Sequence, residues 1–417
     1  MRKTAVFLIF FLTLIQTFAQ DWQPLKLPFG NDQTRFRLIK VPMNAIIETS
    51  YGKSLDVDSF YQKLSEADIV LIGESHTNDT HHALQLNIIK GLLARGKTPA
   101  LGLEMFNPTQ NAGLANYAAG AFEDSEFAKN TDYFNTWGHN LRYYLPIFSC
   151  ARENGLPIQG VNIPSDRLKE LKKTGLDGLE KALMEGEAFP DTTNQQHRFF
   201  IETMMQGIGA QAPGVFDGIY LTQCLWDANM AQGLIEMCRA LEHRPIICLA
   251  GSGHVAYGLG IARLVASRSN LKTVTVMPVD IAEPKSKKNS DHPGFMVHMK
   301  KGSNQKPEPA STIVSAGLAD FLIGVKAEKQ ERYPAPPFKV FEKDGQLVVG
   351  GILPGTWAYK AGFRKNDIII SLNSRKWQSA HELNLFLHNL NWDETLRAKV
   401  RRDAKTINLK RTVSVKE

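Results

Sequence analysis

The stretch ADIVLIGESHTNDTHHALQLNIIKGLLARG, residues 67–96, decides the fold of the first part of the chain. Its run ADIVLIG (67–73) contains four consecutive aliphatic residues, which is typical of a strand buried on both faces. Polar side chains follow this run at once: Glu74, His76, Asp79, His81 and His82. A site at the end of this strand is therefore predicted.

A helix is expected after this strand, beginning near Asn78 or Asp79, since either side chain can cap it. Apolar residues then recur at helical spacing along one face: Leu84, Ile88, Ile89, Leu92 and Leu93. Gly96 suits the end of this helix, because glycine readily adopts the left-handed conformation that often closes one. His81 and His82 are thereby predicted in the first turn, beside the strand end.

Further β-rich runs alternate with helical patterns along the chain. The runs are TPALGLEMF (98–106), GLPIQGVNI (155–163), RPIICLAG (244–251) and LKTVTVMPV (271–279), and the strongest helix is FDGIYLTQCLWDANMAQGLIEMCRALEH (216–243). Continuous apolar strands separated by helices predict an α/β domain, with a mainly parallel sheet covered by helices on both faces.

Polar or turn-forming residues end four of these strands. They are Glu74 and His76, then Glu104, then Asn162, and lastly Gly251, Ser252, Gly253 and His254. Ligands bind at the carboxyl ends of parallel strands, so Glu74, His76, Glu104 and His254 are predicted to meet in one crevice. This set suits a divalent metal that activates water, or an acid and a base without metal. Capping and core hydrogen bonding are the alternative for any one of them.

The N-terminus, MRKTAVFLIFFLTLIQTFAQDW (1–22), combines two basic residues, an apolar run and a small-residue step at Ala19. This pattern predicts a signal peptide over residues 1–19, because the apolar run is shorter than the roughly 20 residues that cross a bilayer. We therefore expect an exported protein, with the periplasm as its compartment and no membrane span in the mature chain.

The net charge of +7 does not indicate a nucleic-acid partner. Much of the basic excess lies in residues 396–416, and no recognition helix, zinc finger or RNA-binding aromatic motif accompanies it.

The four cysteines stand in apolar runs without CxxC spacing: Cys150, Cys224, Cys238 and Cys248. Buried thiols are the favoured interpretation, and one disulfide is the alternative.

Several ordered motifs together resemble the haem-binding ChaN family, within the superfamily of the Tiki proteases and erythromycin esterases. The motifs are LIGESHTNDTHH (71–82), LGLEMF (101–106), WGHNLRYYLPIFSCARENGLPIQGVNIP (137–164), CLWDANMA (224–231) and LAGSGHVAYGLGI (249–261). The resemblance covers roughly residues 50–325. It implies an α/β domain that binds haem through a tyrosine, in at least one member as a face-to-face haem pair between two subunits.

Carried onto this chain, the resemblance places the iron ligand at Tyr144, with Tyr143 as the close rival. A phenolate is a hard anionic ligand that suits ferric haem. Three residues are candidates for a neighbour that lowers the pKa of the tyrosine: His81, His82 and Arg142. Aromatic packing beside Trp137 explains both tyrosines without the resemblance.

The hydrolytic members of the superfamily imply an alternative function. This chain keeps a G-E-x-H step at 73–76, a second-strand acid at Glu104 and a G-x-x-H step at 251–254, which resemble theirs. A periplasmic metal-dependent hydrolase is therefore the second hypothesis.

Residues 344–411 resemble a bacterial PDZ domain, which binds an extended peptide by adding it as a strand. A charged, proline-containing break at 326–338 separates the two parts, so we predict domains at 20–328 and 334–413. FLIGV (321–325) is interpreted as the last strand of the first domain. The carboxylate-binding loop is expected just before Phe338, where YPAPPF departs from the glycine-containing pattern; a closed groove is the alternative.

These observations predict an exported haem-binding protein of iron uptake, whose PDZ domain binds a peptide or protein partner. A scaffold in which the PDZ domain carries the function is a third hypothesis.

Overall fold

The computed structural model describes residues 26–173, 188–205, 212–283, 310–352 and 356–414. The predicted signal peptide lies outside these residues. So do most of two segments that the sequence suggests are exposed loops, 283–295 and 300–312.

An eight-stranded sheet forms the centre of the first part of the chain, in the order β3-β2-β10-β8-β4-β7-β5-β6. Its strands are β2 (Ile46–Glu48), β3 (Lys53–Leu55), β4 (Ile69–Glu74), β5 (Ala100–Leu103), β6 (Ile158–Gly160), β7 (Ile246–Gly251), β8 (Thr273–Ile281) and β10 (Phe321–Lys326). The strands from β10 to β6 run parallel, whereas β2 and β3 are antiparallel. The predicted mainly parallel sheet is confirmed, and 321–325 lies in it.

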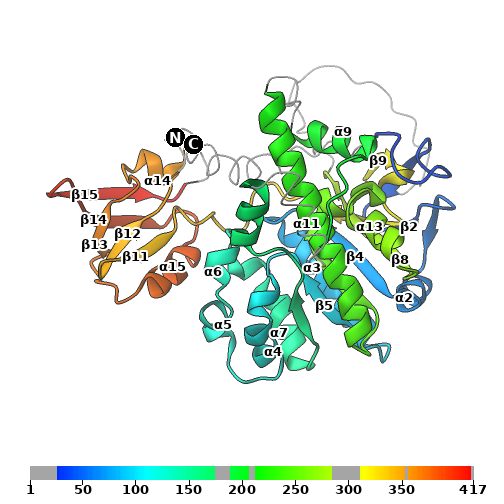
Figure 1. Cartoon of the computed structure of the whole chain (residues 1–417), viewed down its shortest axis with the longest axis horizontal. Helices are drawn as coiled ribbons and strands as arrows, with labels where there is room; N and C mark the ends of the chain where they lie inside the picture. Colours follow the sequence, from blue (N-terminus) through cyan, green and yellow to red (C-terminus); the bar gives the residue numbers. More distant parts are fainter. Residues whose placement is uncertain (1–25, 174–187, 206–211, 284–309, 353–355, 415–417) are drawn as a thin grey trace, which may run out of the picture.

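Helices cover both faces of this sheet (Figure 1). One face carries α9 (Gln195–Met204), α11 (Pro213–Ala240), α12 (Ser252–Val255) and α13 (Ile261–Arg268). The other carries α2 (Val57–Ser65), α3 (Asp79–Leu93), α4 (Asn111–Ala118), α5 (Asp124–Asn130), α6 (Tyr133–Thr136) and α7 (Leu145–Glu153). Within β4, Ile69 and Leu71 join one apolar core, while Val70 and Ile72 join the other. Alternate side chains therefore bury both faces, as the continuous apolar run predicts.

The strands β4 and β7 are neighbours whose following helices lie on opposite faces of the sheet. Ile88 and Leu92 of α3 pack in one core, and Ile261 and Val265 of α13 pack in the other. Such a switch point leaves a crevice beyond the carboxyl ends of the two strands. The side chain of Asn78 caps α3, accepting a hydrogen bond from the amide of His81, so the predicted helix start is confirmed.

Short elements complete this part of the chain. They are the pair β1 (Leu38–Pro42) and β9 (Ser311–Ser315), and the 3-10 turns η2 (Pro108–Gln110), η3 (Leu141–Tyr143), η4 (Ala256–Gly258) and η5 (Ala316–Leu318).

All four cysteines are free and buried, which confirms the buried-thiol interpretation. In the described ranges, no helix combines the length and apolar character that a membrane crossing requires.

The described C-terminal part is a five-stranded antiparallel sheet with two helices, as the resemblance to a PDZ domain predicts. Its elements are β11 (Val340–Lys343), β12 (Gln346–Val349), α14 (Trp357–Lys360), β13 (Ile368–Leu372), α15 (Ala380–His388), β14 (Thr395–Arg402) and β15 (Lys405–Thr412). A separate apolar core fills it.

The helix α15 packs beside α6 of the larger domain (Figure 1). The rings of Phe134 and His388 lie 4.3 Å apart, and the Asn140 side-chain amide donates to the His388 main-chain oxygen at 2.6 Å. Arg142 donates to the main-chain oxygen of Leu390 at 2.5 Å. The segment that joins α6 to α7 is therefore held from the C-terminal domain.

Candidate functional site

The four predicted strand-end residues meet around Gly251. Gly251 and Glu74 are register partners at the ends of β7 and β4. A Cβ atom added at Gly251 would lie 3.0 Å from Nε2 of His76 and 3.5 Å from Oε2 of Glu104. Only glycine therefore leaves room for the two side chains to approach. Oε1 of Glu104 lies 3.4 Å from Nε2 of His254, so all four side chains belong to one cluster.

Glu74 is buried and surrounded by hydrogen-bond donors. The hydroxyl of Tyr144 donates to its Oε1 at 2.8 Å, and Nδ1 of His76 lies 2.8 Å from the same oxygen. The amide of Gln85 donates to Oε2 at 2.8 Å, and Nδ1 of His82 is 3.1 Å from it. A carboxylate offers about four lone-pair sites, so these neighbours use its whole capacity.

The carboxylate and the imidazoles of this network each stabilise the charged form of the other. Burial is the largest influence on Glu74 and opposes its ionisation, but the imidazoles of His82 and His76 hold its pKa well below its usual range. Burial likewise lowers the pKa values of His76 and His82, and the nearby carboxylates more than reverse this. The network therefore holds a carboxylate beside imidazoles that favour the protonated form.

Glu104 and His254 form the second half of the cluster. Oε2 of Glu104 accepts the main-chain N–H of Gly251 at 2.5 Å, and Nδ1 of His254 lies 2.7 Å from Oδ1 of Asp227. Burial opposes the charge on His254, but its two carboxylate neighbours raise its pKa to about 10. Asn162, at the third strand end, donates to the main-chain oxygen of Glu104 at 3.1 Å. Acid and base groups thus lie at the predicted crevice.

A divalent metal at this cluster is not supported. In the described ranges, no group of three or more His, Cys, Asp or Glu side chains is arranged to hold a metal ion. The physical reason is that the oxygens of Glu74 and Glu104 already accept hydrogen bonds from the protein. The predicted metal set Glu74, His76, Glu104 and His254 instead forms paired hydrogen-bonding groups.

The predicted iron ligands are buried in the structure. Tyr144 has no exposed surface, and burial followed by the charge of Glu74 raises its pKa well above its usual range. Tyr143 donates to the main chain at Tyr333 and is also buried; burial raises its pKa. The expectation of a neighbour that lowers the pKa of Tyr144 is therefore wrong, because the nearest charge is a carboxylate. Because its hydroxyl is buried and hydrogen-bonded to Glu74, Tyr144 in this position does not fit an iron ligand.

The three proposed neighbours of Tyr144 lie in different places. The ring of His82 is 4.5 Å from that of Tyr144 and joins the Glu74 network. His81 turns away, because its Nδ1 accepts the Ser75 amide and its Nε2 lies 3.2 Å from Asp280. Arg142 faces the PDZ domain, with its guanidinium over the ring of Tyr333.

Two residues that the sequence does not single out lie at the mouth of the cluster. The ring centroid of His139 is 4.7 Å from that of His76 and 5.2 Å from that of Trp137. Burial, then the neighbouring His76, lowers the pKa of His139 well below its usual range. In the described part of the chain, the buried indole nitrogen of Trp137 makes no hydrogen bond of good geometry, although it lies near the Tyr144 hydroxyl. A neutral imidazole beside an aromatic ring and an unused donor fits a haem group.

Gln85 and Asp227 are further site residues that the sequence analysis did not assign. Gln85 lies three residues before Ile88 on the buried face of α3, and Asp227 lies three residues after Cys224 on the buried face of α11. A polar residue at an apolar position of a helix is the sequence signal that could identify both.

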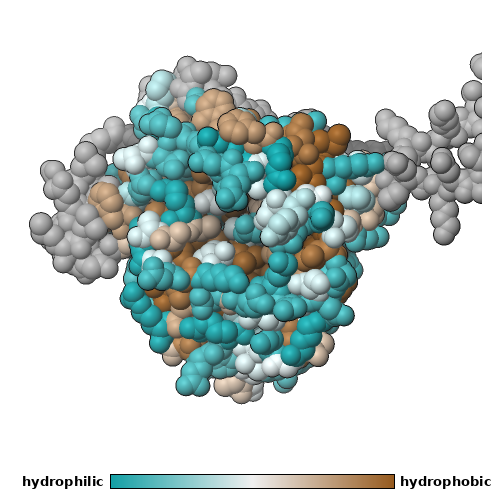
Figure 2. Space-filling view, turned by 90° about the vertical axis from the view of Figure 1, so that its right-hand side faces the viewer, coloured by the Kyte–Doolittle hydropathy of each residue, from teal (hydrophilic) through white to brown (hydrophobic). Residues whose placement is uncertain are grey.

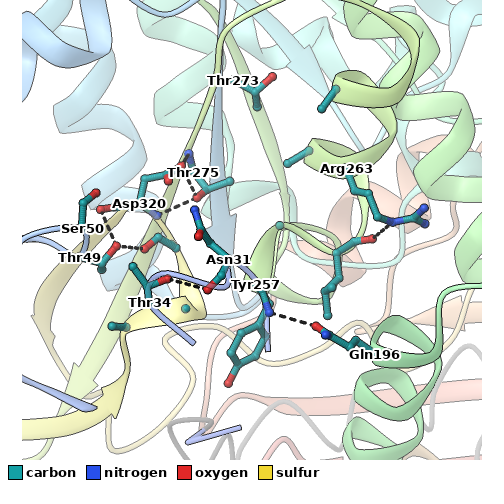
Figure 3. A pocket seen from close by; sticks show the side chains of 18 of the residues that line it. Asn31, Thr34, Thr49, Ser50, Gln196, Tyr257, Arg263, Thr273, Thr275 and Asp320 are labelled. Carbon is teal, nitrogen blue, oxygen red and sulfur yellow. Dashed lines mark hydrogen bonds between the residues drawn. The ribbon is translucent and has the colours of Figure 1, made fainter. Parts of the chain in front are cut away.

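A separate cavity of about 710 Å³ lies away from these residues (Figure 3). Its lining includes Thr49, Tyr257, Arg263, Thr275 and Asp320, and none of the predicted site residues. Its lining residues include members of α13 and the residues after β2. On this side of the molecule hydrophilic residues dominate the surface, and hydrophobic ones show in smaller patches between them (Figure 2). The strand-end cluster and this cavity are therefore distinct features.

Residues 60–265 match the family model described as "Haem-binding uptake, Tiki superfamily, ChaN", and residues 322–413 match the PDZ domain model. The second match overlaps β10, but the pairing of β10 with β8 places that strand in the larger sheet. No curated protein matches the chain.

Among solved structures, ChaN of Campylobacter jejuni with cofacially bound haem is similar at 15% identity and a TM-score of 0.49, covering 67% of this chain and 95% of that one. An erythromycin esterase mutant, EreC in its open conformation, gives 15% identity, a TM-score of 0.38 and coverage of 70% and 98%. An HtrA-type protease with a tripeptide gives 14% identity, a TM-score of 0.19 and coverage of 21% and 33%.

Proposed function

Since residues 60–265 belong to a ChaN-like domain of the haem-binding Tiki superfamily and the C-terminal residues after β10 form a PDZ domain, we propose that the protein binds haem at the strand-end crevice. In this proposal the chain is exported to the periplasm and serves iron or haem uptake. The PDZ domain recruits a peptide or protein partner, and two chains share a haem pair.

The family match is the observation that carries the proposal, and the mouth of the cluster supports its location. An imidazole and an indole there offer a haem group a nitrogen ligand, an aromatic face and a hydrogen-bond donor. When bound, haem supplies an iron whose axial position a protein side chain can take.

Titration of haemin into the purified full chain tests this proposal. We expect a saturable change of the Soret absorbance with a defined stoichiometry. A linear response without saturation would argue against haem binding. Light scattering with and without haemin then shows whether binding produces a dimer.

A matched pair of glycine variants tests the location. In Gly251→Ala the new methyl group would lie 2.9 Å from Cε1 of His76, so it must displace this imidazole. Gly218→Ala on α11 meets nothing within 4 Å and is the control. Haem affinity is expected to fall in the first variant and stay unchanged in the second; equal affinities would place the haem elsewhere.

A metal-independent hydrolase is the second candidate. It is favoured by the imidazole of His254, which lies between the carboxylates of Glu104 and Asp227. A carboxylate that orients an imidazole is a common arrangement for acid–base catalysis. Hydrolysis of an activated aryl ester by haem-free protein, lost in Glu104→Gln, would support it. A rate equal to the buffer background would exclude this substrate class.

A further inference from the structure

The hydroxyl of Tyr144 already has a partner inside the protein. It donates to Glu74 at 2.8 Å and lies 3.4 Å from the main-chain oxygen of His76. Its ring packs between those of His82 and Phe148. Binding iron through this oxygen would break the hydrogen bond and leave Glu74 without one donor.

The histidines of the Glu74 network are also held through their ring nitrogens. His82 directs Nδ1 to Gln85 and Glu74, and Nε2 to the main-chain oxygen of His76 at 3.2 Å. His76 directs Nδ1 to Glu74, while its Nε2 lies on the Gly251 side of the cluster and makes no hydrogen bond to a described residue. Each of these imidazoles therefore has at least one ring nitrogen tied to Glu74.

His139 differs from them because neither of its ring nitrogens is tied to the carboxylate of a described residue. In the described part of the chain, the hydrogen bond found for this residue is at its main-chain oxygen, which accepts from the Tyr133 hydroxyl at 3.1 Å. Its side chain is only half-buried. Both ring nitrogens are therefore available to a ligand.

The protein holds His139 in place from both sides. The Tyr133 hydroxyl fixes its carbonyl, and the next residue, Asn140, donates to the carbonyl of His388 in α15 at 2.6 Å. The ring itself contacts His76 and Trp137. A side chain on a fixed backbone is preorganised for a metal ligand.

We propose that His139, and not Tyr144, supplies the axial ligand to the iron of bound haem, with Trp137 packed beside the porphyrin. The inference rests on the proposed haem binding. Tyr144 then acts as a positioning residue that orients Glu74.

Haemin-loaded full-length variants test this assignment: His139→Gly, Tyr144→Phe and, as control, His243→Ala beyond the opposite end of the sheet. We expect His139→Gly to weaken haem binding by more than the roughly 10- to 100-fold that loss of a merely orienting group causes. Its electron paramagnetic resonance and resonance Raman spectra should lose imidazole ligation, and added imidazole should restore them. Tyr144→Phe and His243→Ala should keep the wild-type spectra.

Resonance-enhanced phenolate bands in the wild type that vanish in Tyr144→Phe would overturn the assignment, as would wild-type spectra in His139→Gly. Either result leaves haem binding itself intact. Failure of the wild-type protein to bind haemin saturably would instead overturn the proposed function. Circular dichroism of each variant, together with the imidazole rescue, separates loss of a ligand from loss of the fold.

Discussion

The hydroxyl of Tyr144 donates a 2.8 Å hydrogen bond to Oε1 of Glu74, 70 positions earlier in the chain. This contact joins the segment after α6 to the end of β4. It also fixes the Glu74 carboxylate that His76 and His82 share. The tyrosine that the family resemblance selects as an iron ligand is thus part of the internal support of the site.

Tyr144→Phe is therefore expected to destabilise the larger domain. It removes one donor from a buried carboxylate, which typically costs about 1–3 kcal/mol. Urea unfolding followed by tryptophan fluorescence measures the change. Tyr51→Phe, at a 68% exposed position, is the control and should leave the midpoint unchanged. Coinciding midpoints for Tyr144→Phe and wild type would contradict the assigned hydrogen bond.

The Glu104–His254 pair predicts a pH-dependent stability. Glu104 and Asp227 raise the pKa of His254 from 6.5 to about 10, against the effect of burial. A raised folded-state pKa stabilises the protein fully below pH 6.5, and this contribution is lost as the pH rises through about 10. The wild type should therefore lose unfolding free energy between these pH values.

Glu104→Gln should flatten this dependence, because it removes one of the two carboxylates that hold the proton on His254. Burial opposes ionisation of Glu104, but His254 and His76 lower its pKa, so its own contribution is present above pH 4.5 and lost on acidification. Denaturant midpoints across both ranges check this. Glu236→Gln, exposed on α11, is the control and should show the same pH dependence as the wild type. If the midpoints of Glu104→Gln changed with pH as those of the wild type do, Glu104 would not influence the protonation of His254.

The sequence predicts the backbone of the site better than its side chains. The apolar runs identify β4, β5, β6, β7 and β8, and the carboxyl ends of parallel strands must lie at one edge of a sheet. The meeting of Glu104 with Gly251 and with His254 follows from that rule.

The direction of a side chain in a connecting segment does not follow from strand rules. Tyr144 and His139 both lie between α6 and α7, and one turns inward to Glu74 while the other stays at the mouth. Contacts with α15, more than 200 positions away in the chain, help to hold that segment (Asn140 to His388 spans 248 positions). No local pattern encodes such a contact, so the sequence could not rank the two residues.

Arg142→Ala should loosen the docking of the PDZ domain. Arg142 donates to the side chain of Asn391 at 2.8 Å and to Leu390 at 2.5 Å, and hydrogen bonds of a charged group contribute about 1.5–3 kcal/mol. We expect faster proteolysis in the 327–339 connection and a larger radius of gyration by small-angle scattering. Arg397→Ala, exposed on β14, should change neither quantity. Identical scattering from Arg142→Ala and wild type would show that other contacts dominate.

Asn384 covers one of the two edges of the PDZ sheet. β11 is an edge strand, and Asn384 of α15 accepts from the Val340 amide at 2.9 Å and donates to the Val340 carbonyl at 3.0 Å. An added peptide strand would need these same main-chain groups, so it must displace the asparagine side chain.

Asn384→Ala should therefore destabilise the PDZ domain by about 1–3 kcal/mol, because Val340 is left with buried groups that lack partners. Thermal unfolding of the full chain measures the shift of the transition assigned to this domain. Asn408→Ala, exposed on β15, should stay within about 0.5 kcal/mol of the wild type. An unchanged transition in Asn384→Ala would mean that water reaches Val340 freely, and the edge would then already be open to a peptide.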